Sequence, residues 1–172
     1  MPKIIENLRE KLLEEAKKQI KENGYAKTTI RSIAKGCDVG TGTVYNYFPS
    51  KDMLIASFMS GDWKKCVENM KASETDDPKA MLRLVCESLE SFIENHDYLL
   101  SDKDAGTSFS SAYSTYHGHM RKQVAQIIMP MCEKNGRPDP FVSEFIAESI
   151  LIWTVNGKSF EEQYEVLKLL FD

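Results

Sequence analysis

Residues 28–54 constrain the fold more than any other part of this chain of 172 amino acids. Thr28 or Thr29 can cap a short helix whose buried side is formed by Ile30, Ile33 and Ala34. The segment 36–38, Gly-Cys-Asp, breaks that helix, and a second short helix follows at about 41–48. Two short helices joined by a tight turn are typical of the helix-turn-helix, a motif that reads the major groove of DNA.

The second of these helices has a chemically distinctive outer side. Val44 and Phe48 stand four residues apart and are expected to point inward. The remaining positions then face outward or sideways, and they are Thr41, Thr43, Tyr45, Asn46 and Tyr47. Hydroxyl, amide and aromatic groups of this kind suit phosphates and base edges, so this surface is predicted to contact DNA.

The same stretch resembles the N-terminal domain of TetR-type transcriptional regulators. The resemblance rests on Gly24-Tyr25, Thr28-Thr29-Ile30, Ile33-Ala34, Val39, Gly42-Thr43-Val44-Tyr45, Tyr47-Phe48 and Ser50-Lys51. Two positions depart from the family pattern: Asp38 replaces the usual Gly of the turn, and Gly40 replaces the usual Ser before the second helix. Asp tolerates the left-handed conformation and Gly is an acceptable N-cap, so we expect an intact motif with slightly weaker capping.

The resemblance and the side-chain chemistry together assign roles within the motif. The predicted phosphate contacts are Thr29, Thr43, Tyr47 and Lys51. The positions that approach base edges in the family correspond to Arg31, Thr41, Gly42 and Tyr45. Asn46 is expected to read adenine or to touch the backbone. The alternatives are that Tyr45 packs against a neighbouring helix and that Asn46 is merely solvated.

The charge distribution agrees with a DNA-binding N-terminal segment. The whole chain has a formal net charge of −4, yet residues 1–60 hold ten Lys or Arg against seven Asp or Glu. Residues 61–172 hold twelve against nineteen, so the acidity lies in the C-terminal part. Attraction to phosphate requires the DNA-binding part to be the basic one, as it is here.

The cysteines and the hydropathy pattern favour a cytoplasmic protein. The four cysteines show no Cys-x-x-Cys spacing, and no signal peptide is recognisable before the first helix. No apolar run approaches the ~18 residues that a membrane span requires, so no membrane partner is expected.

Helical signals continue along the rest of the chain. The pattern predicts an all-α fold of about nine helices, with a three-helix DNA-binding domain over 1–49 and a helical ligand-binding and dimerisation domain over 50–172. A long helix from about Lys51 to Lys71 would connect them. Further helices are expected from Pro78, over about 105–134, from Pro140, and after the capping box Ser159-x-x-Glu162. The stretch 98–105 is polar and irregular, or a short helix of its own.

The last two predicted helices indicate a homodimer. The helix after Asp139-Pro140 is apolar nearly all round, and the terminal helix ends in Leu-Leu-Phe, so a single chain offers them too few neighbours. The residues expected at a four-helix interface are Phe145, Ser149, Ile152, Trp153, Phe160, Tyr164, Leu167 and Phe171. A two-fold axis would present two recognition helices to two half-sites ~34 Å apart, which predicts a palindromic double-stranded DNA operator.

Aromatic and polar side chains predict a ligand cavity in the C-terminal part. They are Phe58, Trp63, Phe92, Tyr98, Tyr113, Tyr116, His117 and Met120. Tyr and His need hydrogen bonds when buried, which favours a cavity, although such a stripe can also be ordinary core. The set contains no Lys or Arg, so the expected ligand is a neutral or cationic small molecule that acts as an inducer.

A metal site is the alternative for this region, but no cofactor is expected. His117 and His119 lie two residues apart, which on a helix directs them about 200° apart, so they cannot share one ion. His96, Cys66, Cys86 or Cys132 would have to converge through the fold.

An enzyme is the hypothesis of a different class. The sequence contains no Gly-x-Ser-x-Gly elbow, phosphate loop or His-Glu-x-x-His helix, so we predict no enzymatic activity. The family resemblance implies a transcriptional regulator, commonly a repressor released by an inducer. A dimeric helical ligand-binding or metal-sensing protein without this DNA-release mechanism is the other reading.

Overall fold

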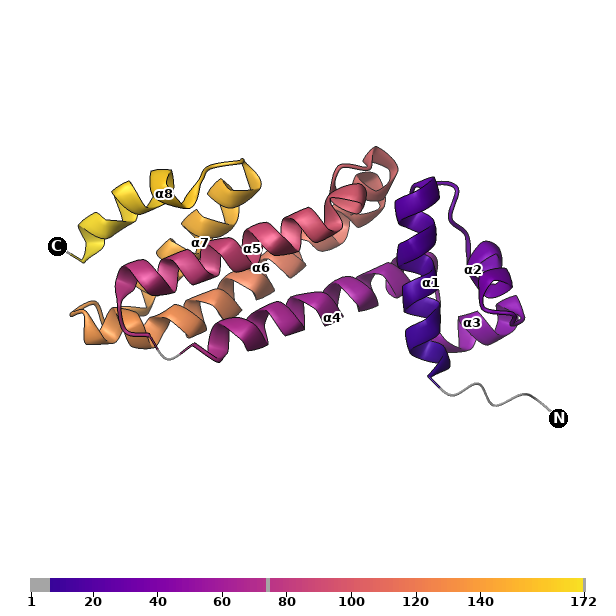
Figure 1. The fold of residues 1–172 in the computed structure, drawn as a ribbon, viewed down its shortest axis with the longest axis horizontal. Helices are drawn as coiled ribbons and strands as arrows, with labels where there is room; N and C mark the ends of the chain where they lie inside the picture. The colour runs from indigo at the N-terminus through magenta and orange to yellow at the C-terminus, as the bar shows by residue number, and fades with distance from the viewer. Residues whose placement is uncertain (1–6, 74, 172) are drawn as a thin grey trace. The chain divides into compact units, whose positions relative to one another are not determined.

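The computed structural model describes residues 7–73 and 75–171, except for the side chains of 109–115. All regular structure in these ranges is helical, which confirms the predicted all-α fold. The elements in chain order (Figure 1) are α1 Leu8–Asn23, α2 Ile30–Gly36, α3 Thr41–Tyr47, α4 Lys51–Lys71, α5 Pro78–Leu100, α6 Lys103–Lys134, α7 Pro140–Val155, α8 Phe160–Leu167 and the 3-10 turn η1 Lys168–Leu170.

The helix starts that the sequence predicts are confirmed by their caps. Asp139 Oδ1 accepts a hydrogen bond from the Phe141 N–H at 2.9 Å, with Pro140 at the first helical position of α7. Ser159 and Glu162 form the reciprocal capping box that begins α8. Local chemistry near each helix start therefore fixes where these helices begin.

The structure differs from the predicted helix boundaries in the stretch 98–105. This stretch forms no short helix of its own, because α5 continues to Leu100 and α6 begins at Lys103. Asp102 makes this sharp break possible: its Oδ1 accepts hydrogen bonds from the backbone N–H groups of Asp104 and Ala105 at 2.9 and 3.1 Å. One capping carboxylate is enough to start α6, so the break between the two helices leaves no longer pattern in the sequence, and the polar stretch was expected to be irregular.

The helices divide into two compact units. The first comprises residues 1–62 and 96–111, and the second comprises residues 63–95 and 112–172. Helices α4, α5 and α6 therefore each contribute residues to both units. The predicted domain boundary between residues 49 and 50 stays a prediction, since it concerns a functional module and not the division by contacts.

The core of the first unit joins the three N-terminal helices to the start of α4. Its fully buried side chains include Leu12 and Ile20 of α1, Ile33 of α2, Val44 of α3 and Leu54 of α4. One buried stripe per helix leaves the opposite side of α2 and α3 to solvent.

The core of the second unit is built by five helices. Its buried residues include Val67 of α4, Leu82 of α5, Ile128 of α6, Ile150 of α7 and Phe160 of α8. Within the ranges described, no helix is both long enough and apolar enough to cross a bilayer.

Candidate nucleic-acid interface

The helix-turn-helix forms as the sequence predicts, and Thr29 is the cap. Thr29 Oγ1 accepts a hydrogen bond from the Ser32 N–H, and Ser32 Oγ accepts one from the Thr29 N–H, both at 3.0 Å. Thr28 instead is buried and donates its hydroxyl to the Gly24 carbonyl at 2.9 Å. This reciprocal box fixes the start of α2 where its first turn faces solvent.

The turn between the two helices uses the two residues that depart from the family pattern. Asp38 adopts φ 55°, the left-handed conformation that a tight turn requires. Gly40 is the N-cap of α3 and makes no side-chain hydrogen bond, as expected for a residue without a side chain. Val39 donates its N–H to the Ala34 carbonyl at 3.0 Å, which closes the turn against α2.

The outer side of α3 is exposed as predicted. Val44 is fully buried and Phe48 is 2% exposed, whereas Tyr45 is 54% and Tyr47 is 45% exposed. The other predicted DNA contacts in the motif are exposed, apart from the half-buried Thr43; they are Thr29, Arg31, Thr41, Gly42 and Asn46. The predicted contact residues therefore face solvent, and their contact with DNA stays a prediction; the alternative that Tyr45 packs against a neighbouring helix does not fit its exposure.

A surface hollow of about 510 Å³ lies between α2 and α3. Arg31 and Lys35, one helical turn apart, lie on its α2 side, and Asp38 and Thr41 on the other. Two cations with a hydroxyl suit a phosphate oxygen, while the Asp38 carboxylate opposes one.

Lys51 has a structural role that the sequence did not reveal. Its ammonium donates hydrogen bonds to the carbonyls of Tyr25 and Thr28 at 2.8 and 3.1 Å, and it lies 3.5 Å from the centre of the Tyr25 ring. Burial lowers the pKa of this ammonium, while Asp52 and Asp102 act in the opposite direction. Lys51 therefore fastens the loop between α1 and α2 to α4, and its predicted phosphate contact stays a prediction.

Tyr25 joins three other segments of the first unit. Its hydroxyl donates to the Asp52 carboxylate or to Ser108 Oγ, and its backbone N–H donates to Asp102 Oδ2 at 3.1 Å. Burial, followed by the neighbouring Asp52, raises the pKa of the Tyr25 phenol. The family pattern includes this Gly-Tyr pair, but its partners come from residues far away in the sequence.

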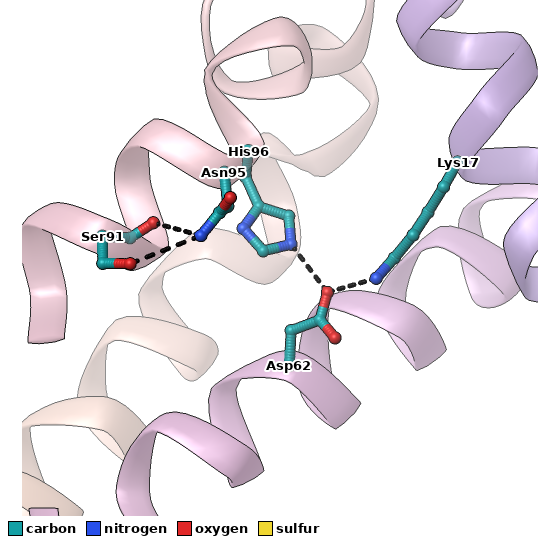
Figure 2. Close-up of polar contacts among 5 residues, drawn as sticks. All are labelled: Lys17, Asp62, Ser91, Asn95 and His96. Carbon is teal, nitrogen blue, oxygen red and sulfur yellow. Dashed lines mark hydrogen bonds and ion pairs between the residues drawn. The ribbon is translucent and has the colours of Figure 1, made fainter. Parts of the chain in front are cut away.

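A second polar cluster holds α1 against α4 and α5. Figure 2 shows the Asp62 carboxylate between the Lys17 ammonium, with which it forms an ion pair, and the His96 imidazole, whose Nε2 lies 3.2 Å from Asp62 Oδ2. Burial would raise the pKa of Asp62, but the hydrogen bond and charge of Lys17 together with His96 outweigh it and lower the pKa. Lys17 also lies 5.2 Å from the centre of the Phe58 ring.

The predicted ligand residues occur in both compact units. In the first unit, the rings of Phe58 and Tyr98 each stack with the His96 imidazole, with centroids 6.5 Å apart. In the second unit, Trp63 donates its indole N–H to Gln123 Oε1 at 2.7 Å and meets the Phe92 ring edge to face. The hydrogen bond to Gln123 satisfies the Trp63 indole within the second unit, as an ordinary core also does.

The remaining predicted ligand residues are on α6. Met120 is half-buried against the core of the second unit, Tyr116 is 46% exposed, and the side chain of Tyr113 lies outside the described residues. His117 Nδ1 and Arg121 Nη1 both lie 3.8 Å from Glu148 Oε2 of α7. The sequence set contained no arginine, so this neighbouring cation was missed; its i, i+4 spacing from His117 was the available signal.

The predicted dimer residues separate into two groups. Phe145, Ile152 and Trp153 of α7 are 49%, 40% and 51% exposed, which leaves an apolar face uncovered in the single chain. Phe160 and Leu167, both 4% exposed, lie in the core of the second unit, and their predicted place at the dimer interface stays a prediction. On the terminal helices Val166 and Leu169 are 66% and 64% exposed.

The exposed face borders a groove of about 460 Å³ on α7 and α8. Its lining includes Phe145, Ser149 and Trp153 of α7 and Val166 of α8. Tyr164 and Phe171, also predicted at the interface, are half-buried and pack against the core. An apolar groove between two helices is the shape that a second helix pair fills in a four-helix bundle.

The charged side chains show no sign of a metal centre in the ranges described. Across residues 7–73 and 75–171, no three His, Cys, Asp or Glu side chains converge as ligands would. The four cysteines are free thiols, and burial raises the pKa of Cys66 and Cys132 to about 11.

The helix-turn-helix lies in the part of the chain that matches a known family. Residues 12–58 match the family model described as bacterial regulatory proteins of the tetR family. Over these residues the chain is similar to the TetR family. The match begins in α1 and ends in α4, so it covers the whole helix-turn-helix of this TetR-type domain.

Curated relatives are similar to the chain over its N-terminal part. The HTH-type transcriptional regulator HbdR of Aromatoleum sp. is 41% identical over 54 residues, which are 31% of this chain and 24% of that protein. The uncharacterised HTH-type regulator YuxN of Bacillus subtilis is 33% identical over 91 residues, 51% of this chain and 31% of that protein. The chain thus spans about a quarter to a third of the length of these relatives.

Solved structures are similar over nearly the whole length of the chain. A TetR-family transcriptional regulator from Pectobacterium atrosepticum has a TM-score of 0.70 at 19% identity, covering 96% of this chain and 92% of that one. GusR of Salmonella enterica has a TM-score of 0.67 at 15% identity, with 98% and 96% covered. At such identities the likeness concerns the fold.

Proposed function

We propose that this protein is a sequence-specific DNA-binding transcriptional regulator, and that α3 is its recognition helix. The observation that carries the proposal is a two-turn helix anchored by buried Val44 and Phe48 whose outer side exposes Tyr45 and Tyr47. A helix held this way presents base-reading groups at fixed positions, as recognition requires. The excess of basic residues over 1–60 supports attraction to DNA.

The proposed contacts divide by chemistry. Arg31, Thr41, Gly42 and Tyr45 read base edges, where Arg suits guanine and Thr or Tyr suits a single hydrogen bond or a thymine methyl. Thr29, Thr43, Tyr47 and Lys51 contact phosphates, and Asn46 serves either purpose. Residues 1–49 form the DNA-binding module, and α4 connects it to the C-terminal helices.

The functional unit that we propose is a homodimer on a palindromic operator. The uncovered apolar face of α7 with Trp153, and the adjoining groove on α8, support an isologous interface. Two copies would place two recognition helices about one DNA turn apart, ~34 Å. A monomer would bind one half-site only, with part of the free energy.

We further propose repression that a neutral or cationic small molecule relieves. The aromatic residues Trp63, Phe92 and Tyr98, with His117, are the proposed ligand contacts. A ligand that shifts α4 would change the distance between the recognition helices, because rigid helices transmit small displacements. No cofactor or catalytic activity is part of the proposal, and the free thiols fit the reducing cytoplasm.

Salt-dependent gel shifts test DNA binding directly. The protein is titrated onto DNA from upstream of its own gene and onto a shuffled sequence of equal length, at several salt concentrations. Preference for the upstream sequence, with affinity that falls steeply with salt, supports the regulator. Equal binding to both sequences, or none, together with normal dimerisation would favour the alternative of a ligand-binding or metal-sensing protein.

Linkage tests the release mechanism separately. With a coupling free energy of about 1–3 kcal/mol, saturating ligand weakens operator binding about 5- to 150-fold. Saturating operator must then weaken ligand binding by the same factor. A ligand whose affinity ignores operator has no part in regulation.

A further inference from the structure

A polar seam runs along the contact of α1 with α2. Lys11, Glu15 and Gln19 stand four residues apart, so they form one stripe on α1. Each position meets α2 or its C-cap: the Lys11 carbonyl accepts from Cys37 Sγ at 3.6 Å, Glu15 lies against Gly36, and Gln19 contacts Ser32. The seam therefore follows α2 from its first turn to its end.

Gln19 is hydrogen-bonded on both sides of its amide. Its Nε2 donates to the Ser32 carbonyl at 3.0 Å and to Glu15 Oε1 at 2.6 Å. Its Oε1 lies 2.6 Å from Ser32 Oγ, which donates either to it or to the Thr29 carbonyl. Gln19 thus holds Ser32 by hydrogen bonds, and Ser32 forms the capping box with Thr29. Thr29 is a predicted DNA contact.

Gly36 provides the space for the other end of the seam. A Cβ atom there would stand 2.2 Å from Glu15 Oε1, far inside van der Waals contact. An alanine would push the flexible Glu15 carboxylate away from α2 and from its hydrogen bond to Gln19. Glycine at position 36 lets the Glu15 carboxylate approach α2 closely, and it is not required there by a left-handed backbone conformation.

We propose that Gln19, oriented by Glu15, is a positioning residue for DNA recognition, because it fixes the rotation of α2 about its axis. The apolar anchors of α2, Ile30, Ile33 and Ala34, give attraction without direction, and the helix has only seven residues. Hydrogen bonds are directional and set the angle. Arg31 and Lys35 lie one position before Ser32 and Gly36, so a rotation of α2 moves both cations relative to the DNA.

The proposal rests on the proposed function, and its test compares three variants. Gln19→Leu removes the amide at similar size. Gly36→Ala displaces Glu15. Ile20→Val, the matched control, removes one methyl from the fully buried neighbour on α1 without touching the seam. Affinities for the operator and for single-base operator variants are measured with the melting temperature of each protein.

Gln19→Leu and Gly36→Ala are expected to reduce discrimination among operator variants about tenfold, the scale of one base contact, because they weaken binding to the operator more than binding to shuffled DNA. Ile20→Val is expected to lower the melting temperature and leave discrimination intact. Discrimination that is unchanged in Gln19→Leu, or that falls equally in Ile20→Val, overturns the proposal.

A second measurement separates this proposal from the proposed function. If the wild-type protein shows no sequence preference, the proposed function fails, and amide hydrogen exchange over 30–36 decides the positioning role. Faster exchange there in Gln19→Leu than in Ile20→Val supports the seam as the device that holds α2. Equal exchange in both variants overturns it.

Discussion

Replacing Trp153 with alanine should disrupt the dimer more than any comparable surface change. The side chain is 51% exposed in the single chain, so about 125 Å² of a tryptophan surface of about 250 Å² remains to be covered. At ~25 cal/mol per Å² this area is worth about 3 kcal/mol for each copy and about 6 kcal/mol for both. Alanine retains part of the area and the groove can repack, so we expect the dimer Kd to rise by about a thousandfold.

Sedimentation equilibrium over nanomolar to micromolar protein measures this change. The matched control is Leu100→Ala, because Leu100 is also 51% exposed but lies on α5 in the first unit. The helical circular dichroism of both variants should equal that of the wild type. A Trp153→Ala protein that dimerises with the wild-type Kd would refute the assignment of the α7 face as the interface.

Other substitutions separate recognition, anchoring and core packing. Tyr45→Ala should cost roughly 1–3 kcal/mol of discrimination among operator sequences with unchanged melting temperature, measured by competition gel shift. Lys51→Met should lower the melting temperature, because the carbonyls of Tyr25 and Thr28 lose their donor. It should also weaken binding to all DNA sequences. If the salt dependence of DNA affinity does not flatten by about one unit, Lys51 makes no phosphate contact. Because the pKa of Asp62 is lowered in the folded protein, its carboxylate stabilises the fold at pH values above the ordinary pKa of 3.8, and this contribution is lost as the pH falls through the lowered pKa. Asp62→Asn should therefore be less stable than the wild type at neutral pH. In urea titrations the difference in unfolding free energy between the two proteins should close below about pH 4. Phe160→Ala should cost about 3–5 kcal/mol of unfolding free energy within each subunit, and a variant that merely became monomeric at wild-type stability would argue against its burial.

The first unit illustrates how far local sequence patterns reach. The spacing of Ile30, Ile33, Val44 and Phe48 was sufficient to orient both short helices, because a helix only two turns long has one side that can be buried. Asp38 was expected to tolerate the left-handed conformation, and it adopts it. The exposed positions of the motif followed from the same periodicity, although contact with DNA is a separate prediction.

The sequence pattern did not predict the environment of an apolar residue that could be buried either within its own chain or against a second copy. Phe160 and Leu167 are as apolar as Trp153, and no periodicity within α8 tells whether a helix face meets its own chain or a second copy. The break between α5 and α6 depends on one carboxylate, Asp102, whose other oxygen also holds the Tyr25 N–H. Such choices are made by residues distant in sequence.

The sequence by itself determined the helical class, the helix-turn-helix and the caps at Asp139 and Ser159, since these depend on periodicity and on interactions within a few residues. It left Thr28 and Thr29 open as the cap of α2, and the structure selects Thr29. The tertiary structure decided the partners of Lys51 and Asp62 and the seam through Gln19. A charged or amide side chain has several possible partners of equal chemistry, and only the packing of distant helices selects which one comes within hydrogen-bond distance.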